Sequence, residues 1–258
     1  MVTLHTIDLL RVLISTVMLA YTSWIDVKTR EIYDIIWIFF GALGLVIGTY
    51  EVVTGSLQII DIVFPVAFST ALSLLLGRVG LFGYADVEAF IVLSILNPVP
   101  SRSIRPFFEV TSLIHPLTLF SNSALAGASF SIVLLAMNLF KMFRGVNLFD
   151  GHERNSTLRK MVLMATGMKM NISKIRGPPF QYPLETMEEE GRAIIVMPDI
   201  QDDDAANEIF RKLENVGVDE VWVSYTLPFL VFILIGYILT IVVGDLALFA
   251  LTRFLPGI

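Results

Sequence analysis

The sequence predicts an all-α membrane protein with six transmembrane helices and a small α/β domain between the fifth and sixth helices. Three observations predict this fold. The 258 residues are 55% hydrophobic and only 16% charged, with a mean hydropathy of +0.74, whereas about a quarter of the residues of a soluble domain are charged. Six apolar stretches approach the length of about 20 residues that a helix needs to cross a bilayer. The only sustained polar segment lies between the fifth and the sixth stretch.

The six apolar stretches are predicted to be helices because lipid offers no hydrogen bonds to a backbone, and a helix satisfies its own. The first is expected to be a retained span, since no basic segment or small-residue cleavage site marks it as a signal peptide. The fourth is short and contains Asp86 and Glu88, which makes it the weakest of the six by hydropathy. The predicted spans are residues 6–25, 32–50, 57–76, 81–96, 117–143 and 225–251.

The polar segment is predicted to fold as a β-α-β unit. Residues 192–200 (RAIIVMPDI) and 218–226 (VDEVWVSYT) have the composition of strands. Residues 202–217 between them begin with acidic residues, continue with apolar residues at helical spacing and end in glycine. Asp202 to Asp204 are expected to cap this helix, and the run TMEEEGR at 186–192 to form a solvated loop. The predicted segments are residues 1–143 with five helices, the α/β domain at 144–221, and 222–258 with the sixth helix.

The composition argues against metal, cofactor and nucleic-acid sites. The chain has no cysteine, and its three histidines are far apart in the sequence, so neither a Cys-ligated nor a His-based metal site is expected. The net charge is −6, and no run of like charge is long enough to suggest nucleic-acid binding. We therefore expect no metal, no cofactor and no nucleic-acid partner, and a lipid bilayer around the chain.

Lysine and arginine beside the predicted spans predict the orientation, because cytoplasmic loops are enriched in these residues. Five lysine and arginine residues stand beside the spans on one side of the membrane, and three on the other. The excess predicts a multi-pass protein of the cell membrane with both termini outside and the polar segment in the cytoplasm. Asp26 then lies at the cytoplasmic end of the first span, and Asp86 about one helical turn into the fourth from that side. The five are Lys28, Arg30, Arg78, Lys141 and Arg144, and the three are Arg102, Arg105 and Arg253.

Eight ionisable residues lie inside or beside the apolar spans, where charge is costly and by default indicates function. Most of them have a simpler explanation. Asp8 and Arg11 are three residues apart on one helix face and are expected to pair. Asp61 is near the outer end of its span, and Asp34 is expected to reach the cytoplasmic interface. The eight are Asp8, Arg11, Asp26, Asp34, Asp61, Asp86, Glu88 and Asp245.

Asp245 is harder to set aside, because VVGDLAL places a glycine–aspartate pair well inside the last span. A helix-packing or polar-contact role is favoured over mimicry of a catalytic motif. Glu88 follows Asp86 by two residues and points away from it on a helix, which favours a structural or interfacial role. Lys28 and Arg30 are explained by the excess of positive charge on the cytoplasmic side.

Asp26 and Asp86 differ from the other ionisable residues, because the topology places both at the same depth on the same side. They stand in the segments SWIDVKTREI and LFGYADVEAF. Peptide hydrolysis by paired carboxylates needs one ionised group to take a proton from water and one protonated group to polarise the scissile carbonyl. Two carboxylates held close share a proton and supply both roles. The pair is therefore the predicted catalytic dyad, and Gly83 would allow a close backbone approach beside it.

The segments SWIDVKTREIYD, GYADVEA, PLTLFSNSALAG and WVSYTLPFLVFILIGYILTIVVGDL extend over nearly the whole chain. Together they resemble the archaeal preflagellin peptidases, which are prepilin-peptidase-like aspartyl proteases of the GxGD class that also includes presenilin. The resemblance implies six helices, a cytoplasmic domain before the last one, no metal, and removal of short basic leader peptides from preflagellin or pilin-like precursors. It assigns the first family aspartate to Asp26 and the GxGD aspartate to Asp86. Bacterial relatives also methylate the new N-terminus and carry a cysteine-rich insertion, so this chain without cysteine is expected to be a peptidase alone.

One position departs from the motif of the resembled family. The segment reads Gly83, Tyr84, Ala85, Asp86, with alanine where the family has its second glycine. Alanine disfavours positive φ, so it is expected to stiffen the loop or to move Asp86 away from Asp26. Two other functions stay open: a presenilin-like protease that cuts within a substrate span, and a small transporter whose aspartates bind a cation or relay protons. The position of the aspartates at one interface, rather than at the midplane, counts against the transporter.

Overall fold

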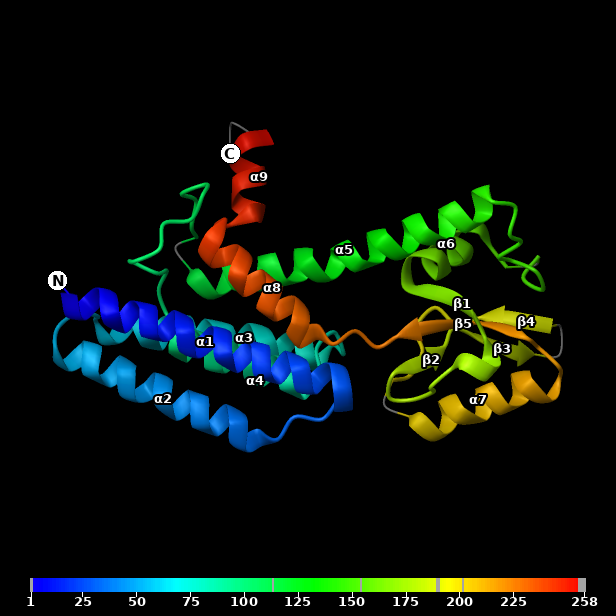
Figure 1. The fold of residues 1–258 in the computed structure, drawn as a ribbon, viewed down its shortest axis with the longest axis horizontal. Helices are drawn as coiled ribbons and strands as arrows, with labels where there is room; N and C mark the ends of the chain where they lie inside the picture. Colours follow the sequence, from blue (N-terminus) through cyan, green and yellow to red (C-terminus); the bar gives the residue numbers. More distant parts are fainter. Residues whose placement is uncertain (1, 113, 154, 189–190, 201, 255–258) are drawn as a thin grey trace. The chain divides into compact units, whose positions relative to one another are not determined.

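The computed structural model describes residues 2–112, 114–153, 155–188, 191–200 and 202–254, and most of them are helical (Figure 1). The chain divides into two compact units. The membrane unit comprises Met1–Gly127 and Pro228–Ile258, and the α/β unit comprises Ala128–Leu227. Helix α5 (His115–Phe143) begins in the first and ends in the second, so the α/β unit extends beyond the predicted domain at 144–221.

The membrane unit consists of apolar helices. Among the described residues, four helices are long and apolar enough to cross a bilayer, and a bent pair counts as a fifth span if its two parts are taken together. A mostly helical membrane fold with a small sheet domain is confirmed, whereas six spans are not. The four are α1 (Val2–Thr29), α2 (Asp34–Val53), α3 (Ile59–Arg78) and α5, the bent pair is α8 (Phe229–Val242) with α9 (Leu246–Phe254), and the remaining helix is α4 (Tyr84–Leu96).

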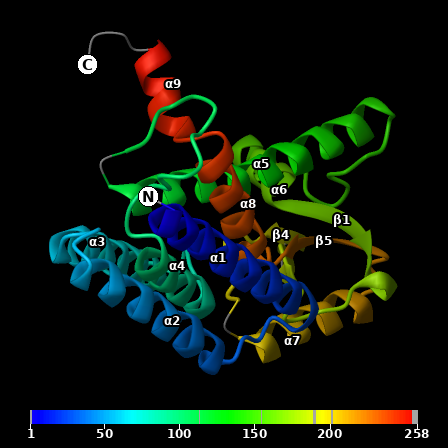
Figure 2. The same ribbon diagram turned by 60° about the vertical axis from the view of Figure 1, so that its left-hand side comes forward.

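α4 is a short helix in the interior of the membrane unit, which explains why it carries charge. It lies among α1, α2 and α3 (Figures 1 and 2). Seven of its 13 residues are buried, and the Ser69 hydroxyl of α3 donates to the Phe90 carbonyl at 3.0 Å. A helix enclosed by other helices needs no apolar surface toward lipid, so α4 tolerates Asp86 and Glu88 near its start.

The sixth predicted span, residues 225–251, is wrong as a continuous helix. The chain forms α8 up to Val242, turns, and continues as α9 at an angle of 57°. Gly244 lies at the turn with a φ of +106°, a conformation that favours glycine. A side chain there would also place its Cβ 2.7 Å from the Val110 carbonyl oxygen. Both the backbone conformation and the packing therefore require glycine at this position.

Neighbouring segments satisfy the polar groups that this turn releases. Asn122 of α5 donates to the Gly244 carbonyl at 2.8 Å and accepts from the Leu246 N–H at 3.2 Å. The N–H of Phe107 donates to the Val242 carbonyl at 2.8 Å. A break in a membrane helix is tolerated where neighbours satisfy the freed backbone in this way.

The predicted pair of Asp8 with Arg11 is wrong. Arg11 is buried and bonds to Glu51 of α2 and to the Leu96 carbonyl at the end of α4. Asp8 accepts from the Ser101 hydroxyl at 2.6 Å. Helical spacing shows which residues share a face but not which partners the neighbouring helices offer, and here those partners are preferred.

The α/β unit contains two antiparallel sheets rather than the predicted β-α-β unit. Three strands pair in the order β1-β5-β2, and β3 pairs with β4. The two predicted strands are present as β4 and β5, but they lie in different sheets. Strands β1, β2 and β3 were not predicted, because a strand of three to five residues is too short to show a period. The elements are α6 (Thr157–Thr166), β1 (Gly167–Asn171), a 3-10 helix (Ile172–Lys174), β2 (Gln181–Pro183), β3 (Glu185–Glu188), β4 (Gly191–Ile194), α7 (Asp203–Asn215) and β5 (Glu220–Tyr225).

Two local predictions in this unit have different outcomes. Asp202 caps α7, as predicted, by accepting from the Ala205 N–H at 2.8 Å. The run TMEEEGR is not a plain loop, because β3 and β4 pair across it with Met187 opposite Arg192. Residues 189–190 of this run lie outside the described residues.

A buried ionic cluster lies in the core of the α/β unit. Glu185 accepts from the Arg192 guanidinium at 2.6 and 3.0 Å and from the Trp222 N–H at 2.8 Å, and His152 Nε2 lies 2.5 Å from Glu185 Oε2. Burial raises the pKa of Glu185, but these donors together outweigh it and hold the pKa below its usual value. The ionised form of Glu185 is therefore part of the folded structure.

We expect acid to destabilise the α/β unit through Glu185. A carboxyl with a lowered pKa contributes stability that is fully present above its unfolded pKa of about 4.3 and is lost as the pH falls through its folded value. The emission of the buried Trp222, isolated by Trp24→Phe and Trp37→Phe, should report this loss as an acid transition below about pH 4.3. Glu185→Gln should weaken that pH dependence and lower the stability at neutral pH by roughly 3 kcal/mol, because it leaves an arginine without its charge partner.

Glu188→Gln is the matched control, since this residue is exposed at the other end of the same strand. It should keep the acid transition of the parent protein. The same acid transition in Glu185→Gln as in the parent would contradict the assignment.

Candidate active site

Asp26 lies in the last turn of α1, and the residue that follows this helix folds back over it. Arg30 has a φ of +61°, a left-handed conformation that costs a residue other than glycine about 1 kcal/mol. Its Nη1 lies 3.6 Å from Asp26 Oδ1, and both side chains are only 15% exposed. The turn thus brings a guanidinium onto the carboxylate four residues earlier.

The first turn of α8 supplies a second group to Asp26. α8 begins after Pro228, and the backbone N–H of Leu230 in its first turn lies within interaction range of the Asp26 carboxylate. The first N–H groups of a helix have no partner within the helix and carry partial positive charge. Asp26 is therefore paired with an arginine and lies near a helix N-terminus.

Asp86 lies in the first turn of α4. Gly83 precedes this helix in an extended conformation, and its N–H donates to Asp86 Oδ2 at 2.9 Å. The carboxylate thus caps the N-terminus of its own helix, and this bond fixes its position at the helix end.

The structure brings Asp26 and Asp86 close enough for their charges to interact, although they come from different helices. Arg30 also interacts with the charge of Asp86. Both aspartates are half-buried. We call the set of Asp26, Arg30, Asp86 and the Leu230 N–H the aspartate site.

An aromatic cluster positions the segments that carry this site. Phe82 precedes Gly83, and its ring centroid lies 5.5 Å from that of Phe90 and 5.0 Å from that of Phe229 at the start of α8. Phe90 stacks on Phe120 of α5 at 3.8 Å between centroids. The rings tie the starts of α4 and α8 to α5, and these two starts carry Asp86 and the Leu230 N–H.

Ala85 lies in the first turn of α4 and not in a loop. Among the described residues, only Arg30 and Glu109 combine a side chain with a positive φ. Ala85 packs against the hydrophobic core of the unit. The stiffened loop that was expected from alanine in this motif is not found, because this position is helical and alanine favours a helix most.

Glu88 and Lys28 have different surroundings. Glu88 is half-buried, and its charge is repelled by that of Asp34 at the start of α2. Lys28 Nζ lies 4.0 Å from the centroid of the Trp24 ring on the exposed side of α1. The structural or interfacial role of Glu88 and the topological explanation of Lys28 stay predictions.

Asp245 and Asp61 act at helix starts. Asp245 is buried and accepts from the Leu248 N–H at 2.8 Å and from the Thr118 hydroxyl at 2.6 Å. Asp61 accepts from the Gln58 N–H at 2.9 Å. The polar-contact role predicted for Asp245 is confirmed.

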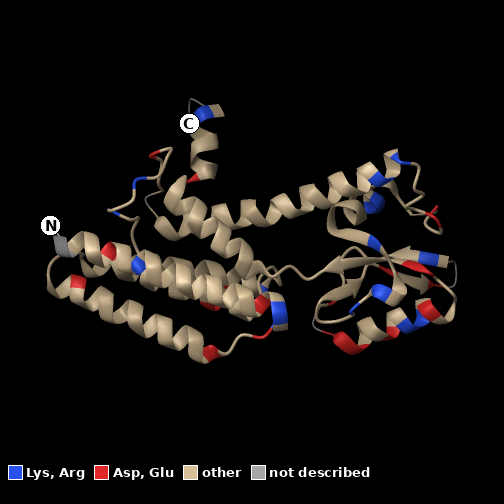
Figure 3. Ribbon diagram, viewed as in Figure 1, with Lys and Arg blue, Asp and Glu red and all other residues tan. Residues whose placement is uncertain are grey.

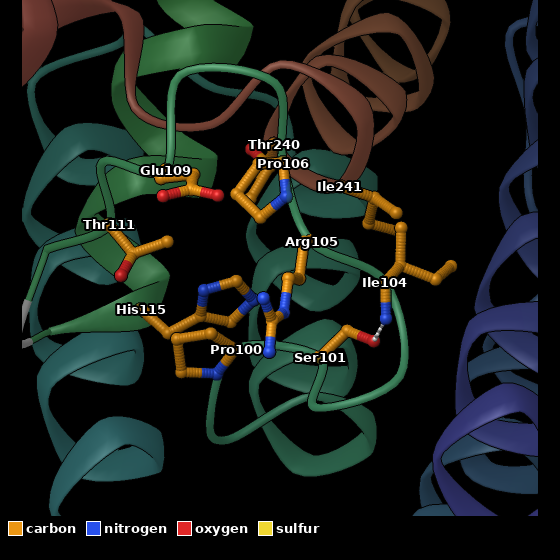
Figure 4. Close-up of a pocket in the computed structure, with 10 residues that line it drawn as sticks. All are labelled: Pro100, Ser101, Ile104, Arg105, Pro106, Glu109, Thr111, His115, Thr240 and Ile241. Carbon is orange, nitrogen blue, oxygen red and sulfur yellow. Dashed lines mark hydrogen bonds between the residues drawn. The ribbon is translucent and has the colours of Figure 1, made fainter. Parts of the chain in front are cut away.

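A cavity of about 270 Å³ lies in another part of the membrane unit (Figure 4). The segment between α4 and α5 forms most of its wall, with Arg105, Glu109 and the buried His115 among its polar groups. Neither aspartate of the aspartate site lines it. Within the described part of the chain, no group of three or more His, Asp or Glu side chains could hold a metal ion.

Two family profiles match the chain. The profile of the type IV leader peptidase family matches residues 13–137, which include both aspartates. The profile described as archaeal peptidase A24 C-terminus type II matches residues 159–246, from α6 to the first residue of α9. The chain belongs to the type IV leader peptidase family. It is therefore a multi-pass membrane protein of a peptidase family.

Two relatives in this leader peptidase family are similar along most of their length. The chain is 26% identical over 234 residues to a preflagellin peptidase of Methanococcus voltae, which covers 85% of this chain and 89% of that protein. It is 26% identical over 231 residues to a preflagellin peptidase of Methanococcus maripaludis, and this match also covers 85% of this chain and 89% of that protein. The similarity therefore extends over the membrane unit and the α/β unit.

The sequence motifs point to Asp26 and Asp86 as the candidate site, but they do not predict which groups surround these two aspartates. From the sequence, Arg30 is explained by topology alone, although a spacing of four residues from Asp26 on a helix is also a signal for an ion pair. The Leu230 N–H is a backbone group, so no residue type identifies it. Pro228 before an apolar run was the available signal, because proline favours the start of a helix.

Proposed function

We propose that the chain is an aspartic endopeptidase that removes the leader peptide from preflagellin or pilin-like precursors. The observation that carries this proposal is that the Asp26 and Asp86 carboxyl groups, from two different helices, are within range of each other's charge. Membership of the type IV leader peptidase family and the names of the two relatives support the substrate class.

The reaction uses one water molecule and one proton shared by the two aspartates. Two carboxylates held close do not ionise together, so one is ionised and one protonated. The ionised carboxylate takes a proton from water as the water oxygen bonds to the scissile carbonyl carbon, and the protonated carboxyl donates to the carbonyl oxygen. When the carbon–nitrogen bond breaks, the nitrogen takes a proton from the pair and a hydroxyl of the intermediate returns one. The pair again holds one proton.

Arg30 and the Leu230 N–H serve as positioning groups in this scheme. Arg30 pairs with the Asp26 carboxylate and the Leu230 N–H lies within interaction range of it, and the Gly83 N–H holds Asp86 by a hydrogen bond. Preorganised donors of this kind keep reacting groups in place without reorganisation during the reaction.

We place the aspartate site at the cytoplasmic face of the membrane. Lys28 and Arg30 stand at the end of α1, beside Asp26, and Lys141 and Arg144 stand at the end of α5. Cytoplasmic ends of spans are enriched in such residues. A precursor with a basic cytoplasmic leader and an apolar helix would present the bond between them at this edge.

The position of the cleaved bond tests the proposed function. The purified full chain in lipid vesicles is mixed with a precursor that has a short basic leader and an apolar helix, and the products are identified by mass spectrometry. We expect one cut at the leader junction, and none with the Asp26→Asn, Asp86→Asn double variant. A cut inside the apolar helix would instead indicate a presenilin-like protease, and no cut under any condition would overturn the peptidase.

We expect Ala85→Gly to leave leader removal nearly unchanged. The residue is helical, so glycine gains nothing from its freedom of φ and costs about 0.5–1 kcal/mol of stability. Activity and thermal melting of the purified protein are compared with those of Ala89→Gly, which places glycine at a buried site in the same helix. A large gain of activity in Ala85→Gly alone would show that alanine impairs the aspartate site.

A further inference from the structure

The α/β unit includes part of a membrane helix whose apolar side chains are exposed. Residues 128–143 of α5 belong to this unit, and among them Ile132 is 68% and Phe143 87% exposed. α5 has 29 residues and is therefore about 43 Å long at about 1.5 Å per residue, whereas a bilayer core is about 30 Å thick. A spanning helix of this length carries its last turns into the membrane–water boundary.

The C-terminal end of α6 is tied to α5 by one side chain. The Asn138 side-chain amide donates to the carbonyls of Met164 and Gly167 at 2.8 Å each. α6 buries one face in the core of the unit and exposes Leu158 by 72% and Met161 by 59% on the other. It thus presents large apolar side chains away from the protein core, next to the end of a membrane span.

Cations border this apolar surface. The helices α5 and α6 carry Lys141, Arg159 and Lys160 and no acidic residue. The Arg144 guanidinium lies 4.4 Å from the centroid of the Phe140 ring. α7, in contrast, carries four acidic and two basic residues (Figure 3). The helices α5 and α6 are therefore basic, with Asp150 and Glu153 in the loop that joins them, whereas α7 has a net negative charge.

We propose that the surface formed by the end of α5 and by α6, which we call the docking face, binds a bilayer that contains anionic lipids. Leu158 and Met161 enter the boundary between headgroups and acyl chains, and Arg144, Arg159 and Lys160 bind lipid phosphate groups. Interfacial helices combine an apolar face with flanking cations in this way. The α/β unit is then held on the membrane by a surface contact as well as by its chain connections.

A lipid surface fits this face better than a second copy of the chain. A symmetric contact between two docking faces would place the cations of one copy against those of the other, since α5 and α6 hold no acidic residue. Anionic phosphate groups neutralise the same cations. The inference is independent of the proposed function, because it uses no residue of the aspartate site.

Single cysteines test the docking face, because the chain has no cysteine of its own. Leu158→Cys and Met161→Cys are labelled with a fluorophore in the full chain, reconstituted in vesicles of phosphatidylglycerol and phosphatidylcholine that carry a quencher near the headgroups. Asn215→Cys, exposed at the end of α7, is the matched control. We expect strong quenching at positions 158 and 161 and little at 215. Quenching at 158 and 161 no greater than at 215 would overturn the proposal.

The charges are tested in the same system. Arg159→Gln with Lys160→Gln should reduce quenching at position 161 in vesicles with phosphatidylglycerol and change it little in pure phosphatidylcholine. Each cation near an anionic surface shifts the bound and free populations by up to about fivefold. Equal quenching of parent and variant in both lipids would remove anionic lipid as the partner. Because both residues lie on the surface and outside the aspartate site, leader removal is measured beside quenching and should persist.

Discussion

Asp26→Asn and Asp86→Asn are each expected to abolish removal of the leader peptide. Asparagine keeps the shape of aspartate but neither ionises nor supplies the shared proton, so both proton transfers fail. Positioned acids and bases contribute up to about 10⁴-fold each, and we expect a loss of at least about a thousandfold. The measurement is the mobility of the precursor on a gel after reaction with the reconstituted full chain.

Two neighbouring carboxyl groups provide matched controls. Asp34→Asn and Glu88→Gln remove charge close to the aspartate site, and Glu88 lies in the same helix as Asp86. Both variants should cleave the precursor at rates near that of the parent. Full cleavage by both single variants of the pair would overturn the dyad. Tryptophan emission and elution volume show that each variant is folded.

The second large effect is expected at Gly236, where α8 crosses α5. A Cβ at this position would lie 2.5 Å from the backbone nitrogen of Ser123 and 2.6 Å from its Cα. Backbone atoms cannot rotate away, so the two helices must separate. Glycine at such crossings lets helix backbones approach closely. We expect Gly236→Ala to cost roughly 3 kcal/mol and to lower the melting temperature of the purified protein strongly.

Gly41→Ala is the matched control for this change. It adds the same methyl group to a membrane helix, but its Cβ would meet only Val92 Cγ2 at 3.8 Å, an ordinary contact. We expect its melting temperature to equal or exceed that of the parent, since alanine favours a helix. Equal melting temperatures for Gly236→Ala and Gly41→Ala would contradict the close crossing.

The sequence predicts the membrane helices well, because an apolar run of about 20 residues has few alternatives in lipid. Prediction from the sequence fails where the structure of a segment depends on residues that are distant in the sequence. Gly244 and Asp245 look like interior residues of one span, but their turn is supported by Asn122 and by the loop before α5. Arg11 finds Glu51 and not Asp8 for the same reason.

In the α/β unit, too, local sequence does not reveal which distant strands pair. Strand β5 is predictable because β-branched and aromatic residues, which favour strands, follow one another in it at Val221, Trp222 and Val223. Its neighbours β1 and β2 are too short to be recognised, and pairing across the intervening α7 cannot be read from local pattern. The aspartates of the candidate site could be named from their motifs, whereas the positive φ of Arg30 that turns its side chain onto Asp26 belongs to the folded chain alone.

The turn that folds Arg30 over Asp26 also sets the charge that an arriving substrate meets. In the proposed resting state, Asp26 and Asp86 together carry one negative charge, since they share a proton, and Arg30 carries one positive charge. The three side chains are then neutral as a set. In the proposed reaction an apolar precursor helix packs over the site and displaces its water, and covering a net charge there would be costly. In the proposed resting state, the zero net charge of Asp26, Asp86 and Arg30 lowers the cost of covering these side chains with an apolar substrate helix.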